Sequence, residues 1–146
     1  MEISNHEYYV SLEVAKLLKE AGFDWKCNGV FLSEDGTHYT FIKADVVCDN
    51  NNSKYNPYNI SASTLEVAQR WLRVVKHLDI SIHYDPTIKS QPYTYSIYDM
   101  EEKFDDILGI ISPVTHSYSD DYFYTYEEAQ KTGIKKALEI ILEKGK

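Results

Sequence analysis

The chain has 146 residues, with 23 acidic side chains against 15 Lys and Arg and a formal net charge of −8. A chain of this length can bury a core without metal or disulfide. Its 43% hydrophobic and 26% charged residues are typical of a globular protein and exclude global disorder. No apolar run approaches the ~20 residues that cross a bilayer, and Met1–Val10 lacks the basic start and apolar core of a signal peptide. We therefore expect a cytoplasmic protein that does not bind a membrane.

The charge also argues against nucleic acid as a partner. Only two arginines, Arg70 and Arg73, are present beside 13 tyrosines. Bases and phosphates are read mainly by Arg and Lys in a basic patch, and a net negative chain repels a polyanion.

The N-terminal part predicts a helix over about residues 12–21 and a hairpin. Ser11 is a candidate N-cap, apolar residues follow at helical spacing, and Gly22 with Phe23 has the pattern of a Schellman ending. Short β-prone runs at 30–32 and 39–42 flank Glu34-Asp35-Gly36, which is a turn signal. Residues 49–59 are expected to form a polar loop.

The central part predicts a second helix over 64–78 and two strands. Ser63 and Glu66 form a capping-box pattern. The apolar face of the helix is expected to comprise Leu65, Ala68, Trp71, Leu72 and Val75. Residues 80–84 and 93–98 alternate between apolar and polar side chains, which is typical of antiparallel strands with one covered face.

The C-terminal part predicts a helix that Thr125 and Glu128 cap, after a short strand near Tyr122–Tyr124. Gly133 within this helix suggests close approach to a neighbouring element. The predicted order is α-β-β-α-β-β-insert-β-α, and the predicted fold class is α+β. We expect a single two-layer domain over residues 1–146, with helices packed on one face of a mostly antiparallel sheet.

An acidic insert, residues 99–121, carries seven acids and one base, Lys103. Residues 100–108 predict a short amphipathic helix ended by Gly109. Such a helix can simply cover the sheet edge in solvent, or it can present a docking surface for a basic protein or a DNA-like display of charge.

The tyrosines admit two interpretations. Tyr93 and Tyr95 alternate with polar residues and are expected in the core, whereas Tyr98, Tyr122, Tyr124, Tyr55 and Tyr58 are expected to be exposed. Exposed tyrosines suit an interface because they offer large contact area at low entropy cost, but cross-strand tyrosine pairs also stabilise sheets without any ligand.

Catalytic and metal motifs are absent from the sequence. The acidic segments lack the calcium-loop pattern, the five histidines lack zinc spacing, and the glycines do not cluster into a phosphate loop. Cys27 and Cys48 are interpreted as free thiols. His83 with Ser81 and Tyr98 is the one combination that could form an enzyme site. We expect no catalysis, no metal and no cofactor.

Three segments together carry a resemblance: VSLEVAKLLKEAGFDW (10–25), SASTLEVAQRWLR (61–73) and YTYEEAQKTGIKKALEIIL (124–142). They resemble small uncharacterised proteins encoded by phages and mobile elements of gut anaerobes. That group shares an opening helix ending in GF, a central PTLxxAxxWL helix and a closing YEEA helix. Ser63 stands where the group often has Pro, and the acidic insert is longer than expected. The resemblance implies a phage or mobile-element accessory protein and transfers no active site.

The leading hypothesis is therefore a non-enzymatic module that binds a host or phage protein in the host cytoplasm. Its predicted contact residues are Asp99, Glu101, Glu102, Asp105, Asp106, Asp120, Asp121, Tyr98, Tyr122 and Tyr124. The alternative is a module that binds or sequesters a small, nucleotide-like ligand by stacking on tyrosine. An enzyme comes third.

Overall fold

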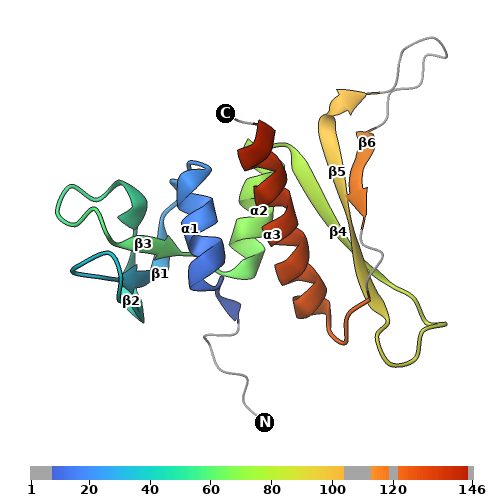
Figure 1. Ribbon diagram of the computed structural model, residues 1–146, viewed down its shortest axis with the longest axis horizontal. Helices are drawn as coiled ribbons and strands as arrows, with labels where there is room; N and C mark the ends of the chain where they lie inside the picture. Colours follow the sequence, from blue (N-terminus) through green and yellow to red (C-terminus); the bar gives the residue numbers. More distant parts are fainter. Residues whose placement is uncertain (1–7, 104–112, 119–121, 145–146) are drawn as a thin grey trace. The chain divides into compact units, whose positions relative to one another are not determined.

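The computed structural model describes residues 8–103, 113–118 and 122–144 (Figure 1). The chain divides into two compact units. The first unit comprises residues 1–68 and 141–146, and the second comprises residues 69–140. Helices α2 (Leu65–Val75) and α3 (Tyr126–Lys144) contribute residues to both units.

The first unit contains helix α1 (Leu12–Glu20), whose ends follow from its capping residues. The Val14 N–H donates to the Ser11 hydroxyl at 3.2 Å, which confirms the predicted N-cap. Gly22 has φ +98°, and the N–H of Phe23 donates to the Leu18 carbonyl at 2.9 Å. This is the Schellman geometry that the sequence predicts.

The sheet of the first unit has the strand order β2-β1-β3, with both pairs antiparallel. Its strands are β1 (Cys27–Leu32), β2 (Thr40–Cys48) and β3 (Ile60–Ala62). A Cβ atom at Gly29 would collide with the carbonyl oxygen of Ala62 and the ring of Tyr9. Glycine is therefore required where β1 faces Ala62 of β3.

Strand β3 was not predicted, because three residues are too short to show alternation. All three of its residues are buried. The predicted loop before it contains the 3-10 turn η2 (Asn50–Asn52). The backbone N–H groups of Asn50 and Asn51 donate to the Ser61 hydroxyl at 3.0 and 3.2 Å, and this fixes the turn against β3.

The second unit contains an antiparallel sheet with the strand order β4-β5-β6. Its strands are β4 (Leu78–Tyr84), β5 (Tyr93–Lys103) and β6 (Pro113–Tyr118). The β4–β5 register runs without interruption from Leu78 opposite Asp99 to Tyr84 opposite Tyr93. The predicted alternation is confirmed at Ile80, Tyr95 and Ile97, which are buried. It is wrong at the loop end of the hairpin, where Tyr93, expected in the core, is half-buried and Tyr84 is exposed.

Helix α3 packs on this buried face. A Cβ atom at Gly133 would lie 2.9 Å from Cγ2 of Ile80 and 3.2 Å from Cγ of Tyr95, so the predicted close approach is confirmed. The apolar stripe of the helix includes four residues with no exposed surface, namely Ala129, Ile134, Ala137 and Leu138. The opposite face of the β4–β5 hairpin carries polar side chains.

A relay of two amides joins three elements of the second unit. Gln130 of α3 is 2% exposed, and its Nε2 donates to Oε1 of Gln69 at 2.8 Å. Nε2 of Gln69, in α2, donates to the carbonyl of Ile80 in β4 at 2.7 Å. A buried amide would be costly without these partners.

The start and end of α2 differ from the prediction. The Val67 N–H donates to the Thr64 hydroxyl at 3.3 Å, so Thr64 caps the helix. Ser63 is fully buried, and its hydroxyl has no partner among the described residues. The helix ends at Val75 and not at residue 78, because His77 adopts φ +59° and Leu78 enters β4. Val75, which was expected on the apolar face of the helix, is 41% exposed.

The α+β class is confirmed, but the strand arrangement is not the predicted one. The described residues form two antiparallel sheets where a single sheet was expected. Residues 100–103 continue β5 and are not helical, and β6 lies within the predicted acidic insert. In place of a strand at 122–124, Phe123 makes an isolated bridge to Tyr93. The remainder of the predicted helix, residues 104–108, lies outside the described residues. Within the described ranges, no helix is both long and apolar enough to cross a membrane.

Candidate functional site

Three tyrosines gather where β4 ends and β5 begins. The ring centroids of Tyr84 and Tyr93 lie 5.3 Å apart, with an angle of 61° between the ring planes. The centroids of Tyr93 and Tyr126 lie 6.3 Å apart, with an interplanar angle of 84°. Tyr84 is 60% exposed and Tyr126 is 41% exposed. We refer to Tyr84, Tyr93 and Tyr126 as the tyrosine cluster. Edge-to-face packing fixes the three rings relative to one another while it leaves ring surface open to a partner.

The backbone beside the tyrosine cluster is held by hydrogen bonds. Tyr93 and Phe123 exchange two backbone hydrogen bonds, at 3.1 and 2.7 Å. The N–H of Glu128 donates to the Thr125 hydroxyl at 3.1 Å, and the Glu128 carboxylate accepts from the N–H of Tyr124 at 3.2 Å. The predicted cap of α3 thus also positions Tyr124, which is exposed.

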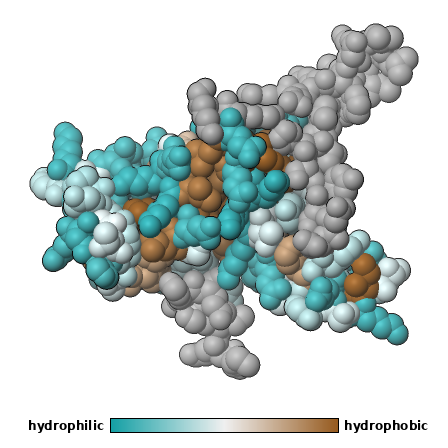
Figure 2. Space-filling model, viewed as in Figure 1, coloured by the Kyte–Doolittle hydropathy of each residue, from teal (hydrophilic) through white to brown (hydrophobic). Residues whose placement is uncertain are grey.

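The loop between β4 and β5 is closed by Asp85. Its N–H donates to the Pro92 carbonyl at 2.7 Å, and its carboxylate accepts from the hydroxyl of Thr87 at 2.6 Å and from the N–H of Thr87 at 2.9 Å. These hydrogen bonds, that from the hydroxyl most strongly, lower the pKa of Asp85. In the space-filling view, the loop end of this hairpin shows mixed hydrophilic and pale surface with a small hydrophobic patch (Figure 2).

The predicted contact residues divide along β5. Tyr122 and Tyr124 flank Phe123, which pairs with the first residue of β5, while Tyr98 and Asp99 lie in mid-strand and are half-buried. Glu101 and Glu102 are strand residues near its far end. Glu101 stands eight residues beyond Tyr93, or about 26 Å along an extended chain. Tyr122 and Tyr124 therefore lie at the opposite end of β5 from Glu101 and Glu102. Asp105, Asp106, Asp120 and Asp121 lie outside the described residues.

The polar face of the β4–β5 hairpin contains the residues considered for an enzyme site. Nε2 of His83 lies 3.1 Å from the Ser96 hydroxyl, not the Ser81 hydroxyl. The Ser81 hydroxyl donates to the Asp79 carboxylate at 3.4 Å, and Asp79 also approaches Arg73 at 4.0 Å. Asp79 is four residues from His83, about 13 Å along the strand, so it does not orient the imidazole as a catalytic relay requires.

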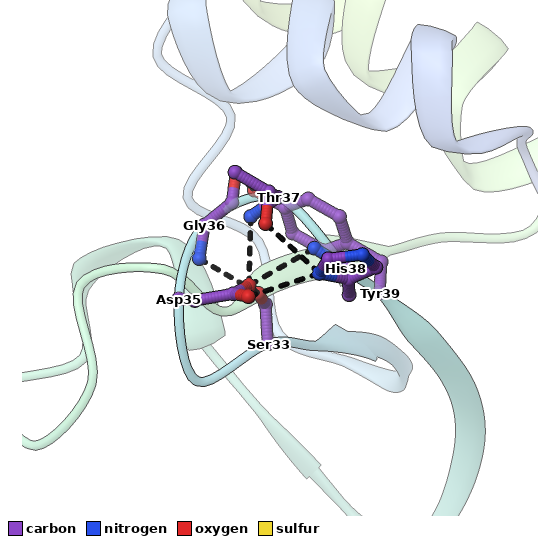
Figure 3. A network of polar contacts seen from close by, with 6 residues as sticks. All are labelled: Ser33, Asp35, Gly36, Thr37, His38 and Tyr39. Carbon is purple, nitrogen blue, oxygen red and sulfur yellow. Dashed lines mark hydrogen bonds and ion pairs between the residues drawn. The ribbon is translucent and has the colours of Figure 1, made fainter.

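The turn between β1 and β2 borders an open depression of about 450 Å³. Figure 3 shows that Asp35 organises this turn. The Asp35 carboxylate accepts from the N–H of Thr37 at 2.9 Å and from the N–H of His38 at 3.0 Å, and the His38 ring lies at 2.9 Å. These contacts, led by the His38 N–H, hold the pKa of Asp35 below its usual range. The depression is lined by Glu34 and Asp35, which disfavours an anionic ligand.

Among the residues that the structure describes, no group of three His, Cys, Asp or Glu side chains could hold a metal ion. Cys27 and Cys48 are free thiols, as predicted, but they stand opposite each other in the β1–β2 register. The sequence could not indicate this pairing, because it depends on how the hairpin is registered.

Comparisons with known proteins give no match: no protein-family model, no curated protein and no solved structure is significantly similar to this chain.

Proposed function

We propose that the protein is a non-enzymatic protein-binding module and that its primary contact surface is the tyrosine cluster. The observation that carries this proposal is the mutual packing of three tyrosines, two of which keep a large part of their surface exposed. Rigid aromatic rings with a polar tip are the side chains most enriched at the centre of protein interfaces.

The position of the cluster supports the same proposal. Its side chains extend from the paired strands β4 and β5 and from the first turn of α3. The backbone of these segments is held by the β4–β5 pairing, the Tyr93–Phe123 bridge and the cap of α3. These side chains would lose little conformational entropy when a partner binds, because their packing against each other already restricts them.

The acidic segment is proposed as a second, separate contact. Glu101 and Glu102 lie on β5, away from the tyrosine cluster, and would steer a basic partner by long-range attraction. The resemblance to phage and mobile-element proteins makes a host or phage protein the proposed partner. A nucleotide-like ligand receives less support, since the depression at the β1–β2 turn is acid-lined.

Affinity purification from host lysate tests the proposal. The double variant Tyr84→Ser/Tyr126→Ser removes the two exposed rings of the cluster. Loss of hot-spot side chains weakens binding by about 30-fold or more, so the co-purifying partner should disappear. Tyr55→Ser is the matched control, because Tyr55 is a tyrosine that is 99% exposed in the other unit.

A second arm addresses the acids. Replacing Glu101, Glu102, Asp105 and Asp106 by their amides should slow association and reduce its dependence on salt, with less effect on dissociation. Retention of the same partner by both the tyrosine and the amide variants, each folded as judged by circular dichroism, would overturn the proposal.

A further inference from the structure

The two cysteines occupy facing positions at the open end of the β1–β2 hairpin. Cys27 is the first residue of β1 and Cys48 the last residue of β2, and the two are register partners. Residues directly opposite on antiparallel strands have Cα atoms about 4.5 or 5.5 Å apart and side chains on the same face. This separation lies within the window of about 4.4–6.8 Å that a disulfide requires.

The ladder next to this pair is irregular. Cys27 pairs with Cys48, but the next pair is Gly29 with Lys43, so Asn28 alone faces residues 44–47. Val46 and Val47, within this bulge, are among the exposed large hydrophobic residues. The regular β1–β2 ladder is interrupted at this end of the hairpin, so a covalent link there would constrain it.

The two thiols differ in access to solvent. Cys48 is exposed, whereas Cys27 is 7% exposed. Sγ of Cys27 lies 3.6 Å from the Gly29 carbonyl and also interacts with Ser61 and the backbone of Ala62, and hydrogen bonds of a thiol are weak. Burial raises the pKa of the Cys27 thiol, so it is a poor first nucleophile. Because Cys48 is the more exposed thiol, we expect it to react first with a reagent in solution and Cys27 to react second.

We propose that Cys27 and Cys48 form a reversible disulfide by exchange with a low-molecular-weight disulfide such as oxidised glutathione. The Cys48 thiolate attacks one sulfur of glutathione disulfide, whose S–S bond breaks, and one glutathione thiolate leaves. The Cys27 thiolate then attacks Sγ of Cys48, the mixed disulfide breaks, and the second glutathione thiolate leaves. The protein loses two electrons and two protons, and the oxidant gains them as two molecules of glutathione.

The consequence is a hairpin closed at its base in the oxidised state. The cross-link encloses residues 28–47 and fixes the two ends of the bulge that carries Val46 and Val47. Closure of a loop of this size should raise the Tm by on the order of 10 °C, and a reductant should reverse the shift. The proposal is independent of the proposed binding role, because it concerns the other unit.

Intact-mass spectrometry of the folded, full-length chain titrated with reduced and oxidised glutathione tests the proposal. The wild type should lose the mass of two hydrogen atoms, with a mixed-disulfide intermediate at early times. Cys27→Ser should stop at a stable glutathione adduct on Cys48. Cys48→Ser should stay unmodified while it is folded and react only after denaturation.

Three outcomes would overturn the proposal: wild-type thiols that both stay free, a stable glutathione adduct on the wild type, or a disulfide-linked dimer. The decisive result comes from the wild-type chain itself, so a variant that fails to fold does not leave the question open. The reductant-reversible Tm shift provides an independent readout on the same sample.

Discussion

The amide relay of the second unit yields the sharpest stability prediction. The Gln130 side chain is almost fully buried and donates to Gln69, which in turn donates to the Ile80 carbonyl. Methionine matches glutamine in length and volume but forms no comparable hydrogen bond. Gln→Met substitutions therefore remove the hydrogen bonds and leave the packing nearly unchanged.

The expected losses follow from the groups left without partners. Gln130→Met leaves Oε1 of Gln69 without its donor, which should cost about 1–3 kcal/mol in the free energy of unfolding. Gln69→Met leaves both the buried Gln130 amide and the Ile80 carbonyl without a partner and should cost about 2–3 kcal/mol. The double variant removes both amides, so its loss should fall short of the sum by about 1–2 kcal/mol.

Urea unfolding followed by tryptophan fluorescence measures these quantities, because Trp71 is buried in α2 of the same unit. Gln91→Met is the matched control, since Gln91 lies in the β4–β5 loop and is partly exposed. Its effect should stay within about 0.5 kcal/mol. Strictly additive losses in the double variant, or a Gln130→Met variant as stable as the wild type, would refute the reasoning.

Three further predictions concern single positions. Gly133→Ala should destabilise the protein by about 0–2 kcal/mol, as measured by thermal denaturation. Overpacking of the new Cβ atom against Ile80, at 2.9 Å, outweighs the gain of about 1 kcal/mol in helix propensity. Clear stabilisation would contradict the close approach. Thr64→Ala should lower the free energy of unfolding by about 1 kcal/mol, because it removes the cap of α2. Ser63→Ala should leave the free energy of unfolding unchanged or raise it, since it removes a buried hydroxyl without a described partner. The reverse order of the two effects would show that Ser63 is the cap. Folding lowers the pKa of Asp35, so its ionised carboxylate stabilises the folded state. This contribution is complete above about pH 4, the pKa of Asp in the unfolded chain, and is lost as the pH falls through the lower pKa of the folded state. Asp35→Asn should therefore lower the Tm at pH 7 and have less effect near pH 2, and an equal effect at both pH values would refute this assignment.

Local signals in the sequence were sufficient for both ends of α1, the start of α3 and the hairpin turn. Ser11, Gly22 and Phe23 predict the cap and the Schellman ending of α1, and Thr125 with Glu128 predicts the start of α3. Each depends on hydrogen bonds between residues a few positions apart, so the neighbouring residues contain the necessary information. The alternation in β4 and β5 is local in the same sense, and it identifies the buried residues Ile80, Tyr95 and Ile97 correctly.

Competition between neighbouring residues limited the prediction of α2. Ser63 and Thr64 can both cap a helix. Thr64 is the cap in the structure because β3 and the following Ser63 are buried in the core. The strand conformation of Met100–Lys103 has a similar origin. Their spacing is compatible with an amphipathic helix, but pairing with β6 extends β5 through them.

The sequence by itself determined the α+β class, the caps of α1 and the start of α3, the hairpin turn and the buried positions Ile80, Tyr95 and Ile97, because each of these follows from interactions between residues close together in the chain. Only the tertiary structure decided the two-sheet arrangement, the tyrosine cluster and the facing positions of Cys27 and Cys48. These features bring together residues 9 to 42 positions apart, and strand register, which no local pattern encodes, sets which of them meet.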